Sequence, residues 1–236
     1  GAMRHLEVVG EGRPLDVPPL PFVAVPTTAG TGAEVTRNAV IGVAAHRRKV
    51  SLRDARMLPR LAVVDPALTD HCPRGVTLAS GLDAITQVIE PYISTKANPL
   101  TDALCRDAIH RGLVALRRLM EAEDPQARDE MAWVSLCGGL ALANAGLGVV
   151  HGLAGPLGGL SGAAHGAICG ALLAPGLRAN AARGADLRGV EAMIAAVHPG
   201  GLAPWARSCG LRGLDALGVT AEMRDLAAEA AASSSS

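Results

Sequence analysis

Short apolar runs separated by turn residues dominate the first third of the chain. Residues 22–25, 38–43 and 61–64 form apolar runs bounded by proline, glycine or polar residues, which is typical of β-strands. The first and the last of these runs have the composition of buried strands. The polar turn at 45–49 leads into a further short run at 50–52, so we expect a β-hairpin there.

From about residue 73 onward the apolar residues follow the spacing of α-helices. Asn98 and Asp124 each stand before a proline, and this pairing is a strong start signal for a helix. Ser80 can cap a helix in which the following apolar residues share one face. The predicted helices begin near residues 80, 99 and 125, the second reaching about 120 and the third about 144–148, and two more cover 187–197 and 220–232.

The change in pattern divides the chain near residues 70–76. Three or four strands with scarcely any helix do not make a complete α/β layer, because no amphipathic helices cover the sheet. The strand-rich piece, residues 4–72, therefore has the features of the later half of an α/β domain, and residues 73–232 those of an all-helical domain. The serine run at 233–236 has no means of packing and is expected to fray.

Composition and charge exclude several classes of function. The chain carries 22 basic and 22 acidic residues and no basic stripe, which argues against nucleic-acid binding. No apolar run reaches the length of a membrane span, and the longest, at 136–150, is broken by glycines and predicts a buried helix. The five cysteines are scattered without a C-x-x-C pair. Neither a disulfide framework nor a cysteine-based zinc site is expected, and a reducing cytoplasm is the natural compartment.

Two histidines, His151 and His165, stand fourteen residues apart across a glycine-rich segment. In one straight helix they would lie about 21 Å apart, too far to share a metal ion. The intervening segment GPLGGLSG, at 155–162, is poor helix material. We therefore expect a turn there, with His151 ending one helix and His165 beginning the next, so that both rings converge.

Asp83 is the best candidate for a third partner. It lies in the apolar helical segment ASGLDAITQVIEPY, where a buried carboxylate is unfavourable unless it is paired, hydrogen-bonded or bound to a cation. Two histidines and a carboxylate leave coordination positions open, which suits a catalytic metal that polarises an oxygen. The alternative for each histidine is a hydrogen-bonded residue of the core.

Five motifs between about residues 20 and 180 resemble those of the iron-containing, or group III, alcohol dehydrogenases, and they occur in the same order. The motifs are PTTAGTGAEVT (26–36), LAVVDPALT (61–69), ASGLDAITQVIEPY (79–92), NAGLGVVHGLAGPLGG (144–159) and AAHGAICGALLAP (163–175).

The resemblance implies a dehydroquinate synthase-like architecture in which an α/β dinucleotide-binding domain is followed by an all-helical domain. On this basis residues 4–72 are the remainder of the dinucleotide-binding domain, and residues 73–232 are the metal- and substrate-binding domain. The cleft between the two would hold NAD or NADP and a divalent metal, Fe²⁺ or Zn²⁺. The family's pyrophosphate-binding G-G-G-S loop would lie upstream of residue 1, so the chain resembles the later part of a family member.

Carried over position by position, Asp83, His151 and His165 fall where the family has metal ligands. The family's remaining ligand is usually a histidine four residues after the aspartate, and this position is Gln87 here. A further family histidine near the substrate would fall at Gly155. Both differences from the family pattern therefore fall in the expected metal and substrate site.

On the cofactor side, the resemblance places Thr27 and Thr28 at the threonine pair that contacts the dinucleotide. Asn38, Lys49 and Leu68 fall at further positions that line this site. The segment TTAGTG offers hydroxyls and small residues after a strand, where donors can approach a ribose or phosphate.

The resemblance implies an NAD(P)-dependent oxidoreductase that interconverts a small alcohol and an aldehyde or ketone by hydride transfer at the metal, in a homo-oligomer, most simply a dimer. Two other readings remain open. The glutamine at position 87 also fits a metal-independent enzyme like the maleylacetate reductases, with His151 or His165 as proton donor. The third reading is a catalytically inactive helical scaffold.

Overall fold

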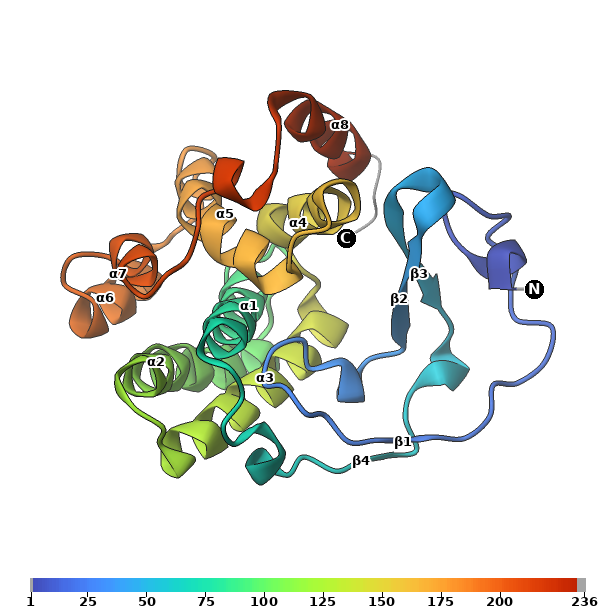
Figure 1. The fold of residues 1–236 in the computed structure, drawn as a ribbon. Helices are drawn as coiled ribbons and strands as arrows, with labels where there is room; N and C mark the ends of the chain where they lie inside the picture. The colour runs from blue at the N-terminus through green and yellow to red at the C-terminus, as the bar shows by residue number, and fades with distance from the viewer. Residues whose placement is uncertain (1, 233–236) are drawn as a thin grey trace.

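The computed structural model describes residues 2–232, in which a strand-containing part is followed by a larger helical part, as the apolar pattern predicts (Figure 1). The serine run at 233–236 lies outside the described residues. The strands are β1 (Val23–Ala24), β2 (Asn38–Val43), β3 (Arg48–Arg53) and β4 (Leu61–Ala62). The helices are α1 (Arg74–Tyr92), α2 (Pro99–Glu121), α3 (Pro125–Ala145), α4 (Val149–Ser161), α5 (His165–Ala181), α6 (Arg188–Val197), α7 (Leu202–Ser208) and α8 (Ala221–Ala232).

The four strands form two separate two-stranded sheets. The predicted hairpin is confirmed: β2 and β3 are antiparallel, in a register that runs from Asn38 opposite Arg53 to Val43 opposite Arg48. β1 and β4 form a short parallel pair. The expected burial of these two runs is wrong, because Val23 and Leu61 are each 54% exposed. Within the described residues β1 and β4 pair only with each other, so most of their surface stays open.

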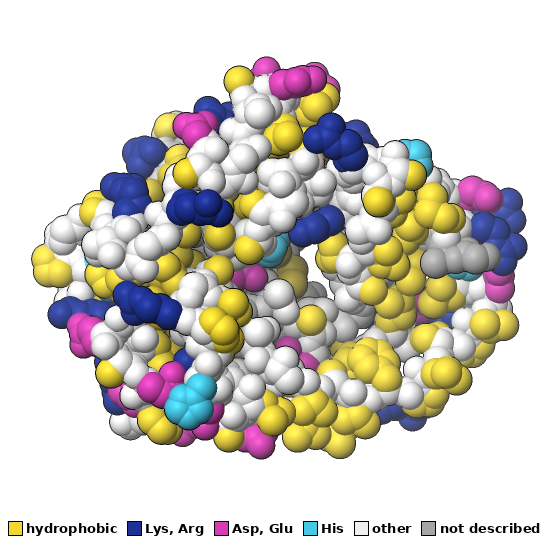
Figure 2. Space-filling view, viewed as in Figure 1, with side chains coloured by type: hydrophobic (Ala, Val, Ile, Leu, Met, Phe, Trp, Pro, Cys, Tyr) yellow, Lys and Arg dark blue, Asp and Glu magenta, His cyan; other side chains and the backbone are white. Residues whose placement is uncertain are grey.

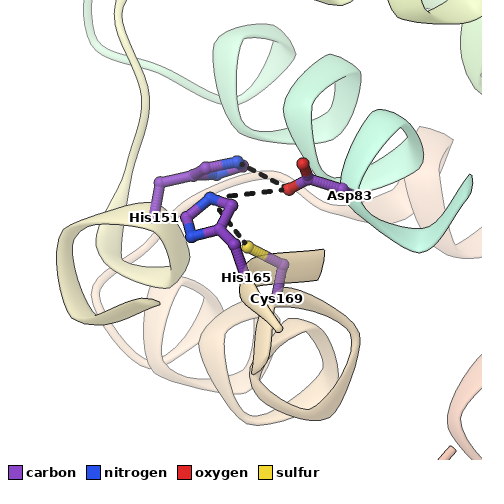
Figure 3. A group of neighbouring side chains, drawn as sticks. All are labelled: Asp83, His151, His165 and Cys169. Atoms are coloured by element: carbon purple, nitrogen blue, oxygen red, sulfur yellow. Dashed lines mark hydrogen bonds and ion pairs between the residues drawn. The ribbon is translucent and has the colours of Figure 1, made fainter. Parts of the chain in front are cut away.

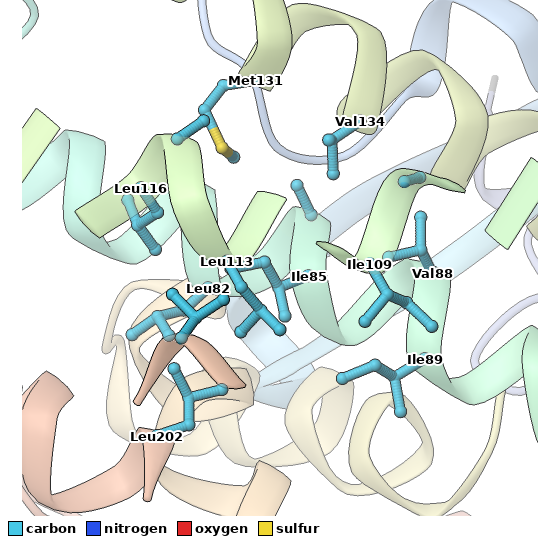
Figure 4. Packing of buried hydrophobic residues seen from close by; sticks show 14 of the residues in the cluster. Leu82, Ile85, Val88, Ile89, Ile109, Leu113, Leu116, Met131, Val134 and Leu202 are labelled. Atoms are coloured by element: carbon cyan, nitrogen blue, oxygen red, sulfur yellow. The ribbon is translucent and has the colours of Figure 1, made fainter. Parts of the chain in front are cut away.

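The core of the molecule lies around α1, which packs against α2, α3 and α5 (Figure 4). Every residue of α1 from 81 to 91 is buried, so this helix has no solvent-facing side over three turns. Each large aliphatic side chain buried here, such as Leu82 or Ile85, stabilises the fold by about 1.5–3 kcal/mol. The polar side chains of α1 are therefore held inside the protein.

The predicted helix starts at Asn98 and Asp124 are confirmed. The side chain of Asn98 accepts a hydrogen bond from the amide of Thr101 and forms a capping box, and Asp124 caps α3 through the amide of Ala127. The predicted start at Ser80 is wrong, because α1 begins six residues earlier, at Arg74, and the Ser80 hydroxyl donates to the carbonyl of Val76 inside the helix. α6 and α8 match the predicted ranges closely, and α7 has no predicted counterpart.

The apolar stretch at 136–150 is not one helix. α3 ends at Ala145, the chain breaks at Gly146, where φ is 71°, and α4 continues at an angle of 105° to α3. No single helix in the described residues has both the length and the apolar composition of a membrane span, and the bent pair of α3 and α4 has them only when both helices are counted together.

The turn expected within GPLGGLSG (155–162) is present, but it lies at the last residue of this segment. α4 runs through Gly155, Pro156, Gly158 and Gly159, and the chain turns after Ser161, at Gly162, where φ is 73°. Packing explains this helix, because a Cβ atom at Gly159 would lie only 2.9 Å from the amide nitrogen of Lys49. The small residues let strand β3 lie directly against α4, and this contact outweighs the weak helix propensity.

Candidate metal centre and adjoining cleft

Three helices bring four potential metal ligands to one point. Asp83 lies in the middle of α1, His151 lies in the first turn of α4, and His165 and Cys169 lie one turn apart at the start of α5 (Figure 3). One ligand atom from each of these side chains lies within 4.8 Å of the other three. His151 begins a helix rather than ending one, but the predicted convergence with His165 is present.

The distances in this cluster match a single ion. Oδ1 of Asp83 lies 3.4 Å from Nε2 of His151 and 3.7 Å from Nε2 of His165. Two ligand atoms that are each about 2.1 Å from an ion in tetrahedral geometry are about 3.4 Å apart. The three side chains therefore need little movement to share one divalent cation.

Two polar atoms of the cluster lack hydrogen-bond partners. The side chains of Asp83 and His151 are only 4% and 7% exposed, yet neither Oδ1 of Asp83 nor Nε2 of His151 makes a hydrogen bond. Burying such atoms without a partner is unfavourable, and a cation between them would satisfy both. The donor set of a carboxylate, two imidazoles and a thiol suits Zn²⁺ or Fe²⁺, so these residues fit a divalent metal.

Glu90 fixes the orientation of His151. Its carboxylate accepts a hydrogen bond from Nδ1 of His151 at 2.6 Å and another from the amide of Val150 at 2.7 Å. The bond at Nδ1 leaves Nε2 of the imidazole facing Asp83. Glu90 also places a negative charge at the start of α4, where the helix dipole favours it. Metal sites commonly place a carboxylate in this way, hydrogen-bonded to the far nitrogen of a ligating histidine.

Two glycines permit this close approach of the helices. A Cβ atom at Gly166, next to His165, would collide with the carbonyl of Ala79 on α1. A Cβ atom at Gly148 would lie 2.8 Å from Oε1 of Glu90. The glycines beside the histidines therefore let α4 and α5 lie close enough to α1 for the cluster to form.

The packing also changes the acid–base properties of the cluster. Burial by itself would raise the pKa of Asp83, but the neighbouring His151 and His165 lower it below the ordinary value. Burial would likewise lower the pKa of His151, but Cys169, Asp83 and Glu90 raise it well above the ordinary value. Burial lowers the pKa of His165, although Asp83 opposes this, and burial raises the pKa of the Cys169 thiol to about 12. A metal ion that binds His151 must displace a proton, so metal affinity rises with pH.

A cleft of about 590 Å³ adjoins the cluster. It lies between the β2–β3 hairpin and the helices α3, α4 and α8, with His151 in its wall. Figure 2 shows the surface hollowed between the helical and strand-containing parts, with basic, acidic and histidine side chains at the hollow. This volume falls in the range of small-molecule and cofactor sites. The basic residues on the hairpin wall are Arg37, His46, Arg47, Arg48, Lys49 and Arg53.

Two of the five predicted cofactor residues line this cleft. Asn38 and Lys49 lie on its hairpin wall, and Oδ1 of Asn38 is buried without a hydrogen-bond partner. Thr27, Thr28 and Leu68 are exposed and do not line it. Thr28 instead borders two narrow crevices, one beside α1 and one beside α3.

The glycines of TTAGTG serve packing in the structure. Gly32 has a φ of 57°, and a Cβ atom there would lie 2.6 Å from the amide nitrogen of Gly139 on α3. A Cβ atom at Gly30 would lie 3.1 Å from Cβ of Ser80 on α1. The loop therefore lies directly on two helices, and its small residues are explained by this contact.

The two positions that depart from the family pattern have different surroundings. The side-chain amide of Gln87 donates a hydrogen bond of 2.6 Å to the carbonyl of Thr31, so it ties α1 to the TTAGTG loop. A Cβ atom at Gly155 would meet no other atom within 4 Å. Gln87 is thus engaged with the loop, whereas Gly155 leaves open space one turn after His151.

Sequence reasoning missed Cys169 and Glu90. Cys169 follows His165 by four residues, and Glu90 follows Asp83 by seven, so each spacing places the pair on one face of its helix. These spacings were the available signals. Neither signal is strong alone, because cysteines and glutamates at helical spacing are common.

Comparisons with known proteins agree with the motifs. Residues 77–201 match the family model described as "Fe-containing alcohol dehydrogenase family, C-terminal", and residues 2–66 match that described as "Iron-containing alcohol dehydrogenase". The chain is 42% identical over 157 residues to alcohol dehydrogenase 4 of Schizosaccharomyces pombe, which is 66% of this chain and 37% of that protein. It is 38% identical over 162 residues to the NAD-dependent methanol dehydrogenase of Bacillus methanolicus, which is 68% of this chain and 42% of that protein.

The fold agrees with a solved structure as well. A crystal structure of 1,3-propanediol oxidoreductase superimposes with a TM-score of 0.81 and 34% sequence identity, over 93% of this chain and 62% of that one. The matches to the two curated relatives, in contrast, cover less than half of the length of each of those proteins. The predicted α/β part followed by an all-α part is confirmed by this likeness.

Proposed function

Because the chain belongs to the iron-containing alcohol dehydrogenase family, we propose that the protein is an oxidoreductase that interconverts a small alcohol and an aldehyde or ketone. Residues 73–232 supply the metal-binding helices, and residues 4–72 contribute to the dinucleotide site. The observation that carries this proposal is the cluster of Asp83, His151 and His165, in which Oδ1 of Asp83 and Nε2 of His151 are buried without a hydrogen bond. His151 also lines the large cleft.

Asp83, His151 and His165 would hold the metal, either Fe²⁺ or Zn²⁺. A divalent metal there supplies Lewis-acid polarisation of the substrate oxygen. The protein holds the three ligands in place before the metal arrives, because each comes from a packed helix and Glu90 fixes the ring of His151. The unsatisfied carboxylate oxygen of Asp83 favours this metal-dependent enzyme over the metal-independent reading.

The cleft would hold the nicotinamide dinucleotide, NAD or NADP, whose own chemistry is hydride transfer. Lys49 supports this placement, because its ammonium group lies beside Gly158 of α4. Burial lowers the pKa of His165, and the nearby charge of Lys49 lowers it further. Asn38 offers a buried oxygen that can accept a hydrogen bond from a bound molecule. Thr27, Thr28 and Leu68 lie outside the cleft, so they would contact only a part of the dinucleotide that extends beyond it. The predicted homodimer and cytoplasmic location remain predictions.

The test is binding to the purified chain. After removal of metal with a chelator, we expect the chain to take up about one equivalent of Zn²⁺ or Fe²⁺ in elemental analysis after desalting. Titration with NADH and NADPH, followed by nicotinamide fluorescence, then examines the cleft separately. A folded chain that takes up no transition metal would contradict the proposal, and metal uptake without nucleotide binding would restrict it to the helical part.

A further inference from the structure

Cys169 lies where a metal ligand would lie. Its side chain is fully buried one turn after His165 on α5, and its Sγ is 3.6 Å from Nε2 of His165. In Figure 3 the thiol points toward the same centre as the carboxylate of Asp83 and the two imidazoles. The thiol is therefore the fourth potential ligand atom of the cluster.

The other cysteines have different surroundings. All five cysteines are free, but Cys105 and Cys137 are buried within the hydrophobic core around α1, and Cys72 and Cys209 are partly exposed. Within residues 2–232, Cys169 is the cysteine that belongs to a group of potential metal ligands. Cys169 is therefore both buried and adjacent to other potential metal ligands, whereas, among the described residues, the other four cysteines are not in such a group.

The cluster contains the two unpartnered atoms that a cation would satisfy, Oδ1 of Asp83 and Nε2 of His151. The side-chain amide of Gln87 donates to the carbonyl of Thr31, which ties this residue to the TTAGTG loop. We propose that Cys169 is the fourth protein ligand of the metal centre, completing a set of one carboxylate, two imidazoles and one thiolate. This inference rests on the proposed metal centre.

The thiolate changes which metal the site selects. When the metal binds, the S–H bond of Cys169 is replaced by a sulfur–metal bond, and the proton passes to bulk water. A thiolate is a soft ligand, so a site that contains one favours Zn²⁺ over the harder Mg²⁺ and Mn²⁺. The expected resident ion is therefore a thiophilic divalent metal held by four protein atoms.

Cobalt and zinc spectroscopy on the purified full chain test the proposal. Titration of the metal-free chain with Co²⁺ should give a thiolate-to-cobalt charge-transfer band in the near ultraviolet that saturates at about one equivalent. X-ray absorption at the zinc edge of the zinc-loaded wild-type chain should show one sulfur neighbour at about 2.3 Å. The second measurement needs no variant, so it stays decisive if a substitution at Cys169 prevents folding.

The variant Cys169→Ser should still bind cobalt but lose the charge-transfer band. Cys137→Ser removes an equally buried thiol outside the cluster and should keep the band. Cobalt bound without a charge-transfer band, or zinc without a sulfur neighbour, would overturn the thiolate ligand and leave the metal centre of Asp83, His151 and His165 standing. A folded chain that binds no Co²⁺ or Zn²⁺ would overturn both.

Discussion

The two walls of the cleft are built differently. On the helical wall, His151 is almost completely buried, with Asp83 buried behind it, and Glu90 holds the imidazole of His151 in one orientation. On the hairpin wall, Arg47 and Arg48 are exposed at the turn between β2 and β3. One wall is fixed by packing and hydrogen bonds, and the other presents positive charge to solvent.

This difference indicates two kinds of recognition. Interactions inside a packed, poorly hydrated site depend strongly on geometry and are weakly screened by salt. Interactions of exposed charges are small individually and fall with ionic strength. We expect the helical wall to determine metal binding with large effects, and the hairpin wall to attract an anionic cofactor with smaller, salt-dependent effects.

The largest effect is expected for Asp83→Asn. This change keeps the shape of the side chain but removes the buried negative charge that faces both histidines. We expect affinity for Zn²⁺ to fall by at least about 100-fold. This is more than the roughly 10–100-fold loss typical when a residue that only hydrogen-bonds to a metal ligand is changed. Competition with a chromophoric chelator measures the affinity. Asp129→Asn, an exposed position on α3, is the control and should leave it unchanged. Unaltered zinc binding in Asp83→Asn would remove Asp83 from the site.

An intermediate effect is expected for Glu90→Gln. The amide oxygen can still accept hydrogen bonds from the start of α4, but the negative charge behind His151 is lost. Zinc affinity should fall about 10–100-fold, the effect typical of a group that hydrogen-bonds to a ligating histidine. The same chelator competition measures it, with thermal unfolding of the metal-free chain as a check on α4. Equal zinc affinity in the variant and the wild type would show that Glu90 does not tune the metal ligand.

The smallest effect is expected for Lys49→Met on the hairpin wall. Removing one charged hydrogen-bond donor should weaken NADH binding by about tenfold at low salt, and by less at high salt. Fluorescence titration at two ionic strengths measures the dissociation constant of NADH at low and at high salt. Lys96→Met removes a charge at an exposed position outside the cleft and should leave NADH binding unchanged. An equal loss in both variants would mean that net charge, not this wall, attracts the nucleotide.

Local signals in the sequence were sufficient for much of the fold. The capping residues Asn98 and Asp124, each followed by proline, marked two helix starts because their chemistry acts within one turn. The hairpin followed from two short apolar runs joined by a polar turn. The start of α1 was misplaced because Ser80 has the chemistry of a cap. In the structure its hydroxyl bonds to Val76 inside a helix that begins at Arg74, and Thr77 and Leu78 in the additional turns are buried.

For the candidate site, the sequence by itself determined that Asp83, His151 and His165 belong together, because a buried carboxylate needs a partner and the motifs matched a family. The tertiary structure alone decided how they meet. Sequence propensity predicted that the glycines of α4 would break the helix, but the contact with strand β3 holds it together, and the chain turns only at Gly162. Helix packing also brought Cys169, one turn after His165 on α5, to Asp83 on α1 and His151 on α4. Such contacts join residues far apart in sequence, so no local pattern records them.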